Sequence, residues 1–288
     1  MNRLKNIAQV ALITSLILFH GCSFYKPLVK NHKWEKPFTF IQMTDPQFGM
    51  ASKNKGFELE TKLFEEAISA ANKLNPSFVV ISGDLINKDG DKEQEAEFYR
   101  ISKKLNKKIP LYLLPGNHDV NKDPTSETIK EYRKNFGKDY YTFTNNGCYF
   151  IVLNSTIFQN SEYCKEEESK QLKWLNKVLQ KTDKYQQSFV IMHHSLFLKM
   201  PDEPDQYFNI PLETRMKYLE LFRKANISAI FSGHYHQNSY GKYGNMEVIT
   251  CCSIGVPFAN DPSGFNIVNV SKNKIDFEYQ ALEEKKIP

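Results

Sequence analysis

Cysteine is scarce in this chain and is poorly spaced for metal or redox chemistry. The 288 residues include five cysteines, two of them adjacent at Cys251-Cys252, and no pair has the Cys-x-x-Cys spacing. Closely spaced cysteine pairs bind soft metals or catalyse redox reactions, and larger sets form the disulfide framework of small secreted domains. The cysteine content therefore argues against a thiolate metal site, a redox motif and a disulfide-stabilised fold.

The chain also lacks a strong excess of charge of one sign. It has 38 Lys and Arg against 33 Asp and Glu, a formal net charge of +5, and these residues are spread along the chain. Proteins that bind nucleic acid usually gather basic residues into a patch or stripe. We therefore expect no nucleic-acid partner. The hydrophobic content of 41% and charged content of 25% are those of a globular protein.

Long apolar runs are absent apart from one at the N-terminus. The run Ile7–Phe19 follows Arg3 and Lys5, spans about 13 residues, and is soon followed by Gly21-Cys22. A membrane-spanning helix needs about 20 apolar residues. A basic start, a short apolar run and a small residue before a cysteine are typical of an export signal, and this one resembles the signal of bacterial lipoproteins.

This pattern predicts three segments of the chain. Residues 1–21 are expected to be a lipoprotein signal peptide, with Cys22 as the lipidated residue, and 22–36 a tether that lifts a domain over 37–288 from a surface. An ordinary secretory signal or an uncut N-terminal anchor stays open as an alternative. All three place the domain outside the cytoplasm, and the first places it at a bacterial cell envelope.

From Pro37 onward, short β-type runs alternate with amphipathic helical segments. Phe38–Met43 and Phe78–Ile81 predict strands, and Glu58–Leu74 between them has the apolar stripe of a helix. This order predicts a strand-helix-strand unit and an α/β fold. Further helices are expected at 93–105 and 169–179, and further strands at 111–114, 140–143, 148–153, 189–192, 229–231, 246–251, 265–270 and 275–279. We expect the last three strands to form a meander.

Polar side chains cluster where five of these strands end. The clusters are Asp45-Pro46-Gln47, Gly83-Asp84, Gly116-Asn117-His118-Asp119, His193-His194 and Gly233-His234-Tyr235-His236. In open α/β sheets, ligands bind at the carboxyl ends of strands, where loops converge. The clusters offer carboxylate, amide and imidazole donors, a set that suits divalent ions such as Mn, Fe and Zn. The sequence therefore predicts a metal site at this edge.

Each cluster taken alone has a simpler interpretation. Gly83-Asp84 is common in turns, and each of the adjacent histidines could be a half-buried residue with an ordinary hydrogen bond. His234 and His236 would point the same way from an extended segment, yet an isolated pair with this spacing binds metal in only a minority of cases. The ordered occurrence of all five clusters, each after an apolar strand, favours the metal site.

The ordered set resembles the calcineurin-like metallophosphoesterases, whose motifs run Asp-x-His, Gly-Asp, Gly-Asn-His-Asp or Gly-Asn-His-Glu, His, and Gly-His-x-His. The match extends from Asp45 to His236. The resemblance implies a four-layer α/β/β/α sandwich, made of two mixed sheets flanked by helices. It also implies a binuclear site with two divalent ions, which could be Mn, Fe, Zn or Mg.

The same resemblance implies a role for each matched residue, with Asp84 bridging the two ions. The other ligands of the first ion would be Asp45, Gln47 and His236. Those of the second ion would be Asn117, His193 and His234. His118 would be catalytic, and Asp119 and His194 would support the ligands or contact substrate. The choice of His193 over His194 follows the family's His-His-Pro-Pro pattern.

The sequence departs from the family pattern at Gln47, where most members have histidine. A Gln amide oxygen is a weaker donor than imidazole, so we expect the first ion to be held less tightly or with different selectivity. The string Asp45–Gly49 resembles a branch described as Ser/Thr protein phosphatases, in which the same Gln stands. Asn87 stands where purple acid phosphatases have a metal-binding Tyr, so that branch is not favoured.

The chemistry implied is hydrolysis of a phosphate ester by a metal-bound hydroxide. Two divalent ions can lower the pKa of a bridging water and clamp phosphate oxygens. His118 would protonate the leaving oxygen, its ring oriented by Asp45 or Asp119. The expected partner is a small phosphorylated substrate or a phosphoprotein, with the ester type and oligomeric state left open. The alternative is a non-catalytic envelope lipoprotein that retains the fold as a binding module, with Gln47 as the first sign of decay.

Overall fold

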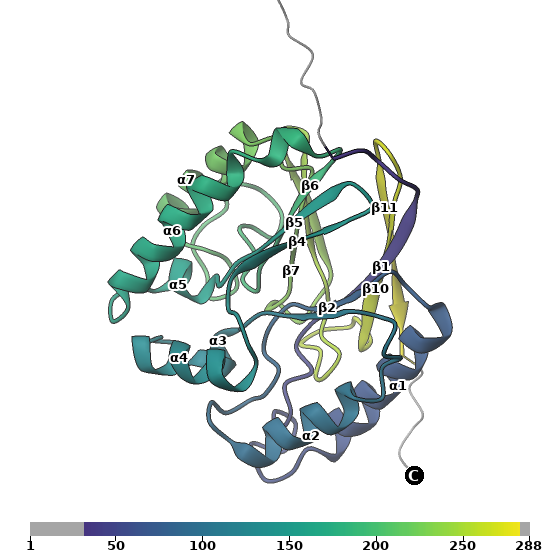
Figure 1. Cartoon of the computed structure of the whole chain (residues 1–288). Helices are drawn as coiled ribbons and strands as arrows, with labels where there is room; N and C mark the ends of the chain where they lie inside the picture. Colours follow the sequence, from purple (N-terminus) through teal and green to yellow (C-terminus); the bar gives the residue numbers. More distant parts are fainter. Residues whose placement is uncertain (1–31, 283–288) are drawn as a thin grey trace, which may run out of the picture.

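The computed structural model describes residues 32–282, in which two β-sheets pack face to face (Figure 1). The strands of the first sheet are β1 (Phe38–Met43), β2 (Val79–Ile81), β3 (Leu111–Leu113), β10 (Gly264–Val270) and β11 (Ile275–Ala281). Those of the second are β4 (Tyr141–Asn145), β5 (Cys148–Val152), β6 (Ser188–Ile191), β7 (Ala229–Ser232), β8 (Ser239–Tyr243) and β9 (Met246–Thr250). The strand orders are β11-β10-β1-β2-β3 and β4-β5-β6-β7-β9-β8.

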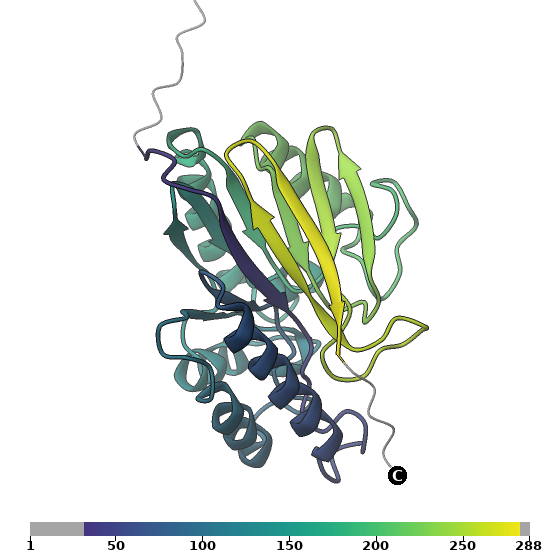
Figure 2. The same cartoon turned by 90° about the vertical axis from the view of Figure 1, so that its right-hand side faces the viewer.

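Helices cover the outer sides of the two sheets. They are α1 (Glu58–Leu74), α2 (Lys92–Ser102), α3 (Asn117–Val120), α4 (Ser126–Asn135), α5 (Thr156–Gln159), α6 (Lys165–Leu179) and α7 (Leu212–Lys224), with a 3-10 turn at Thr182–Lys184. Figure 1 shows α6 and α7 on the side of the second sheet, and α1 and α2 on the side of the first. In Figure 2, β10 and β11 (yellow) face the viewer, and α1 (dark blue) lies lower in the view.

Local sequence explains where the predicted helices begin and end. The α1 helix stops where Asn75 adopts a left-handed conformation with φ of 48°, and Pro76 follows directly. The N-terminus of the α2 helix is capped by Asp91, whose carboxylate accepts hydrogen bonds from the amides of Glu93 and Gln94. These caps satisfy backbone groups that the helix itself leaves without partners.

The innermost core lies between the two sheets and is rich in phenylalanine. The rings of Phe40 and Phe78 stack at 4.8 Å, and both meet the ring of Phe150 edge-on from the opposite sheet. Neighbouring strand residues point outward instead: Ile41 packs under α1 and α2, and Ile151 under the helices of the second sheet. Both faces of these strands are therefore buried, which explains their continuous apolar runs.

The sheets are mixed, and the direction of their parallel strands determines the edge at which the site lies. Parallel pairs join β1 to β2 and β2 to β3 in the first sheet, and β5, β6, β7 and β9 in the second. The antiparallel pairs are β10 with β1 and with β11 in the first sheet, and β4 with β5 and β8 with β9 in the second. The predicted α/β/β/α sandwich of two mixed sheets is therefore confirmed.

The C-terminal strands differ from the prediction of a meander. The β9 strand pairs with β7 and β8 in the second sheet, whereas β10 and β11 form a hairpin in the first. The chain crosses between sheets after β9, so a meander was wrong. The strand β8 and the helices α3, α4, α5 and α7 were not predicted either. In β8 the residues are alternately exposed and half-buried, and only two are aromatic, so its apolar signal is weak.

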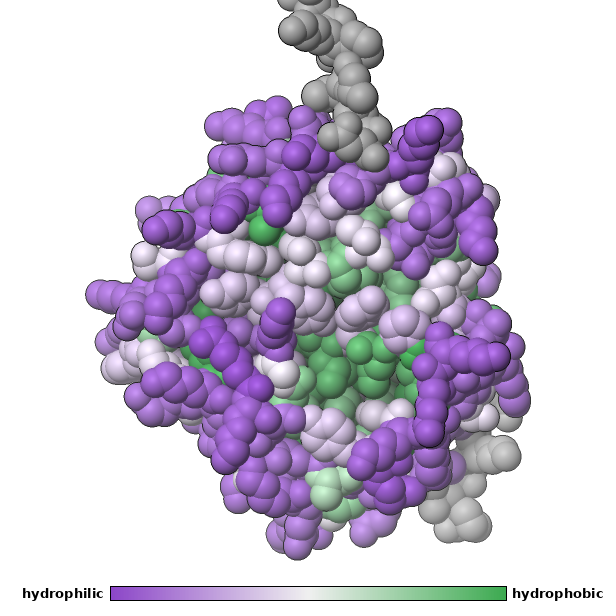
Figure 3. Space-filling view, viewed as in Figure 1, coloured by the Kyte–Doolittle hydropathy of each residue, from purple (hydrophilic) through white to green (hydrophobic). Residues whose placement is uncertain are grey.

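The surface and the ends of the described chain add four observations. The predicted signal segment 1–21 and Cys22 lie outside the described residues. Residues 32–36, the end of the predicted tether, contact the domain: the His32 ring stacks on Tyr185 at 4.2 Å. Between residues 32 and 282, no helix combines the length and apolar character that crossing a membrane requires. Figure 3 shows apolar side chains gathered in a hollow within a hydrophilic rim on the face turned toward the viewer.

Candidate metal centre

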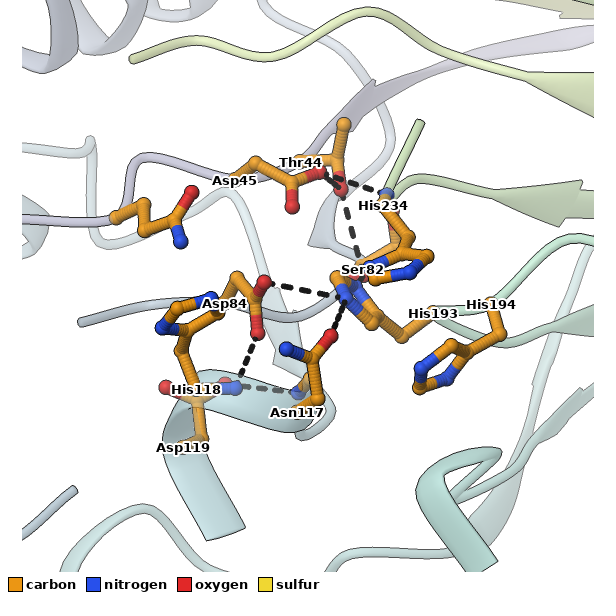
Figure 4. A network of polar contacts seen from close by, with 12 residues as sticks. Thr44, Asp45, Ser82, Asp84, Asn117, His118, Asp119, His193, His194 and His234 are labelled. Carbon is orange, nitrogen blue, oxygen red and sulfur yellow. Dashed lines mark hydrogen bonds and ion pairs between the residues drawn. The ribbon is translucent and has the colours of Figure 1, made fainter. Parts of the chain in front are cut away.

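Five loops bring the predicted ligands together at the carboxyl ends of the parallel strands. Figure 4 shows side chains that converge from the loops after β1, β2, β3, β6 and β7: those of Asp45, Asp84, Asn117, His193 and His234. Hydrogen bonds join the two sheets here. The His193 Nδ1 atom lies 2.8 Å from the Ser82 carbonyl oxygen, and the His234 amide donates to Asp45 Oδ2 at 3.0 Å. The site is thus built across both sheets.

The first group of donors is Asp45, Asp84 and His236. One donor atom from each lies within 4.8 Å of the others, and all three residues are buried. Asp45 Oδ1 has no hydrogen-bond partner, although His236 Nε2 lies 3.3 Å away. The Gln47 Oε1 atom is also buried without a partner, while its Nε2 donates to Asn87 Oδ1 at 3.3 Å. A cation among these oxygens would satisfy both of them.

The second group contains His193, His194 and His234, again with donor atoms within 4.8 Å of one another. Because His193 Nδ1 donates to a carbonyl, its Nε2 carries the lone pair in the neutral ring. This Nε2 lies 3.2 Å from Asn117 Oδ1 and 3.3 Å from Asp84 Oδ2. Three electron-pair donors therefore face one another, an arrangement that a cation stabilises. The geometry favours His193 over His194 for contact with Asp84.

The electrostatics of the centre reflect this concentration of buried charge. Burial by itself lowers the pKa of His193, but the Asp84 and Asp45 carboxylates raise it to about 9. Burial raises the pKa of Asp84, yet His193 and His118 outweigh it and bring that pKa below its ordinary value. The pKa of His234 falls to about 4, first through burial and then through the charge of His193. The two carboxylates thus favour positive charge at this point of the centre.

The ligand-bearing loops hold unusual backbone conformations. Five of the predicted ligands have positive φ angles between 44° and 67°: Asp45, Gln47, Asp84, His234 and His236. Non-glycine residues rarely adopt this left-handed region, and each such residue costs on the order of 1–3 kcal/mol. Five such residues lie in one buried centre. This indicates that the backbone accepts an unfavourable conformation there in order to direct the five side chains into the centre.

Close backbone approach explains two of the glycines in the motifs. A Cβ atom on Gly116 would lie 2.1 Å from Asp84 Oδ1, and one on Gly233 would lie 1.8 Å from Thr44 Oγ1. Both distances are far below ordinary van der Waals contact. These glycines therefore let the loops after β3 and β7 reach the carboxylates of Asp84 and Asp45.

His118 lies at the edge of the centre, half-buried, at the second residue of α3. Its amide donates to Asp84 Oδ1 at 2.8 Å, and its ring Nδ1 lies 2.8 Å from the Asn87 carbonyl oxygen. We expected Asp45 or Asp119 to orient this ring, and that expectation was wrong. The Asn87 carbonyl fixes Nδ1 as the protonated nitrogen in a neutral ring and leaves Nε2 for the reacting group.

Asp119 and His194 lie behind the donors. The Asp119 carboxylate accepts hydrogen bonds from the amides of Leu85, Ile86 and Gly116, so it joins the loops after β2 and β3. Burial and the charge of Asp84 raise the pKa of Asp119 to about 8. His194 Nδ1 lies 3.2 Å from Ser155 Oγ, which also accepts from the amides of both adjacent histidines.

The structure adds residues that the sequence reasoning did not assign to the site. Asn87 contacts both Gln47 and His118, and Ser155 holds the adjacent histidines. The loop after β6 places Tyr207 beside His234, whose Nε2 lies 3.1 Å from the Tyr207 carbonyl oxygen. No local motif marks these positions, because each depends on a contact between segments far apart in the chain.

The comparisons with known proteins agree with this geometry. A family model described as calcineurin-like phosphoesterase matches residues 38–238. The chain belongs to this family. The family predicted from the five motifs is thus confirmed, and with it the enzyme class: this calcineurin-like phosphoesterase is a phosphoester hydrolase of a family that uses divalent metal ions. The alternative of a non-catalytic binding module receives no support from the comparisons.

Curated relatives place the chain in the predicted branch. The human serine/threonine-protein phosphatase CPPED1 is 37% identical over 276 residues, which cover 90% of this chain and 88% of the human protein. The Danio rerio protein of the same name is 32% identical over 279 residues and covers 90% of each chain. The resemblance drawn from the Asp45–Gly49 string is therefore confirmed.

Solved structures share the fold of this phosphoesterase at low identity. A purple acid phosphatase from yellow lupin seeds aligns with a TM-score of 0.66 and 15% identity, over 86% of this chain and 52% of that one. A dimetal phosphatase from Danio rerio aligns with a TM-score of 0.62 and 13% identity, over 86% of this chain and 97% of that one. These alignments support the two-sheet architecture described above.

Proposed function

We propose that this chain hydrolyses phosphate esters at a binuclear centre in which Asp84 bridges two divalent ions. The observation that carries the proposal is the pair of donor groups that meet at Asp84. One holds the unpartnered oxygens Asp45 Oδ1 and Gln47 Oε1, and the other holds the His193 Nε2 atom facing Asp84 Oδ2. Buried polar atoms without partners are rare, so the two in the first group support a bound cation there. In the second group the support is the close approach of His193 Nε2 to the oxygens of Asn117 and Asp84.

The donors divide between the two ions according to these groups. Asp45, Gln47 and His236 would hold the first ion with Asp84. Asn117, His193 and His234 would hold the second, again with Asp84. When bound, two divalent ions neutralise phosphoryl charge, act as Lewis acids and lower the pKa of water. Oxygen and imidazole donors suit Mn, Fe, Zn or Mg, which leaves the identity of the ions to a direct metal analysis.

His118 is placed to handle the proton of the reaction. The Asn87 carbonyl holds Nδ1, so Nε2 of the half-buried ring is the atom that can reach a substrate. We propose that Nε2, when protonated, donates to the leaving oxygen as the ester bond breaks. The backbone of the same residue is anchored to the centre, because the His118 amide donates a hydrogen bond to Asp84 Oδ1 at 2.8 Å.

The first test compares hydrolysis of phenyl phosphate by the manganese-loaded protein and two variants. Asp84→Asn removes the proposed bridge and should abolish activity along with binding of manganese. His118→Ala should lower kcat by about 10²–10⁴-fold and leave manganese binding intact. Asp183→Asn and His32→Ala, which lie outside the centre, are the matched controls and should behave as wild type. Full activity in Asp84→Asn would exclude the proposed site.

The substrate class is proposed from the names of the relatives. CPPED1 is named as a serine/threonine-protein phosphatase, which acts on phosphate monoesters. We therefore propose monoesters as the preferred esters of this chain. A comparison of phenyl phosphate with bis(phenyl) phosphate tests this point, since faster hydrolysis of the diester would contradict it.

We also propose that the chain is exported and anchored by lipid at Cys22 in a bacterial cell envelope. The support is the sequence alone: a basic start, the apolar run Ile7–Phe19 and the Gly21-Cys22 pair. Expression in bacteria with a radiolabelled fatty acid should label the wild-type chain. It should not label Cys22→Ser, which should also leave the membrane fraction. Equal labelling of both chains would contradict the anchor.

A further inference from the structure

A row of aromatic side chains borders the candidate metal centre. Tyr207 and Phe208 lie over the His234 ring, with centroid distances of 5.0 and 5.7 Å. Phe258 stacks on the His236 ring at 4.1 Å, with the planes only 6° apart. Because Phe208 and Phe258 are 6.1 Å apart, the three rings form one continuous surface. We refer to Tyr207, Phe208 and Phe258 as the aromatic wall.

Two rings of the aromatic wall are open to solvent, although the histidines beneath them are buried. Tyr207 is 59% exposed and Phe258 is 47% exposed, whereas His234 and His236 are 4% and 2% exposed. Most large aromatic side chains are covered in a folded protein, and exposed ones beside a polar site mark a place where a ligand binds. Both rings therefore offer exposed aromatic surface at the border of the metal centre.

The loop that carries two of these rings is held rigidly by buried polar side chains. This loop comprises residues 199–211, between β6 and α7. Fully buried Arg215 donates to the carbonyl oxygens of Ile210 and Glu203 at 3.0 and 2.7 Å. The Glu203 carboxylate accepts from the amides of residues 198–200 at 2.8 to 3.2 Å. Charge-assisted bonds of this kind fix a loop strongly, so Tyr207 and Phe208 are held in place before substrate arrives.

The other flank of the centre has a different chemistry. Asn87 joins Gln47 to Asn54 through side-chain hydrogen bonds of 3.3 and 2.7 Å, and Gln94 donates to the same Asn54 oxygen at 2.9 Å. The side-chain amides of this flank form hydrogen bonds with one another. The aromatic wall is therefore the flank whose exposed surface can contact the organic part of a substrate.

We infer that the substrate is a phosphate monoester of an aromatic alcohol, such as a phosphotyrosine side chain, whose ring lies against Tyr207 and Phe258. This inference rests on the proposed function, because the phosphoryl group must sit at the metal centre for the ring to reach the wall. In the reaction the bond between phosphorus and the aryl oxygen breaks, and a water oxygen bonds to phosphorus. One water proton ends on the phenol oxygen and the other on phosphate.

Phosphonates test the inference without depending on turnover, because their carbon–phosphorus bond is not hydrolysed. The experiment measures, by calorimetry on the manganese-loaded protein, the ratio of the Kd of methylphosphonate to that of phenylphosphonate. Wild type should prefer phenylphosphonate. Phe258→Ala and Tyr207→Ala should each reduce this preference by about three- to tenfold, the range for an aromatic pair. Tyr163→Ala, which removes an equally exposed tyrosine elsewhere, should leave it unchanged.

Methylphosphonate affinity separates the wall from the metal centre. If the variants bind methylphosphonate as wild type does and lose affinity only for phenylphosphonate, the ring contacts are supported. Tyr207→Leu provides a second variant that keeps an apolar side chain but removes the aromatic face. An unchanged preference in all three variants would overturn the aromatic wall. Absence of any manganese-dependent phosphonate binding, with no ester hydrolysis, would instead overturn the proposed function.

Discussion

Replacing Gly116 by alanine tests whether the position of Asp84 controls the centre. Gly116 has φ of −103° and ψ of −175°, a backbone conformation that alanine adopts without strain. The new methyl group would nevertheless lie 2.1 Å from Asp84 Oδ1 and 2.4 Å from the Asp84 amide nitrogen. The whole effect of the change is therefore steric, and it falls on the residue that we propose bridges the two ions.

The size of the effect follows from the overlap. An ordinary carbon–oxygen contact is about 3.4 Å or longer, so Asp84 or the loop after β3 must move by more than 1 Å. Overpacking of a tight site typically costs about 1–3 kcal/mol in the free energy of unfolding. A displacement of about 1 Å at a catalytic group can lower the rate by on the order of 10²-fold. We expect Gly116→Ala to fold, to bind manganese weakly, and to lose at least that much in kcat/KM.

The assay combines phenyl phosphate hydrolysis, manganese titration and thermal unfolding. Gly244→Ala is the matched control, because Gly244 has φ of +60° and a Cβ there would meet no atom within 4 Å. That control changes backbone strain alone, at about 1–2 kcal/mol, and leaves the centre intact. If Gly116→Ala kept wild-type manganese affinity and wild-type kcat/KM, the position of Asp84 would not matter and the bridging role would be refuted.

Three further predictions concern the metal and one buried carboxyl. Chelation by EDTA should abolish hydrolysis. It should also lower the unfolding free energy by about 2.7 kcal/mol for each bound ion, relative to protein with that ion at 100 times its Kd, and added manganese should restore both. Activity that survives exhaustive chelation would contradict a metal enzyme. Gln47→His supplies a stronger metal donor, and histidine tolerates the left-handed backbone conformation at this position. The variant should therefore lose manganese to EDTA more slowly than wild type. Faster loss would argue against Gln47 as a ligand. Burial raises the pKa of Glu60 above 4.5, even though a hydrogen bond from the Ala51 amide lowers it. The folded state therefore binds the Glu60 proton more tightly than the unfolded state does. The stability that this proton contributes is present below pH 4.5 and is lost as pH rises through the folded-state pKa. Glu60→Gln should therefore gain stability relative to wild type on going from pH 4 to pH 7 in urea titrations, and parallel pH profiles would contradict this assignment.

Much of the fold could be predicted because its signals are local. The strands that are buried on both faces read as continuous apolar runs, and Glu58–Leu74 was predicted with the bounds of α1 because Pro76 follows it. The edge strand β8 and the crossing of the chain after β9 were not predicted. Edge strands bury little, and the sheet that a strand joins depends on partners distant in the chain.

The sequence by itself determined which donors the centre contains, since five motifs at strand ends carry carboxylate, amide and imidazole groups in a fixed order. It also determined the glycines at 116 and 233, although not the reason for them. Only the tertiary structure decided how the donors are oriented: the Ser82 carbonyl sets the His193 ring, the Asn87 carbonyl sets the His118 ring, and the loop after β6 places the aromatic wall beside them. The physical reason is that composition fixes the available chemistry, whereas tautomer, pKa and access depend on atoms that folding brings within a few ångströms.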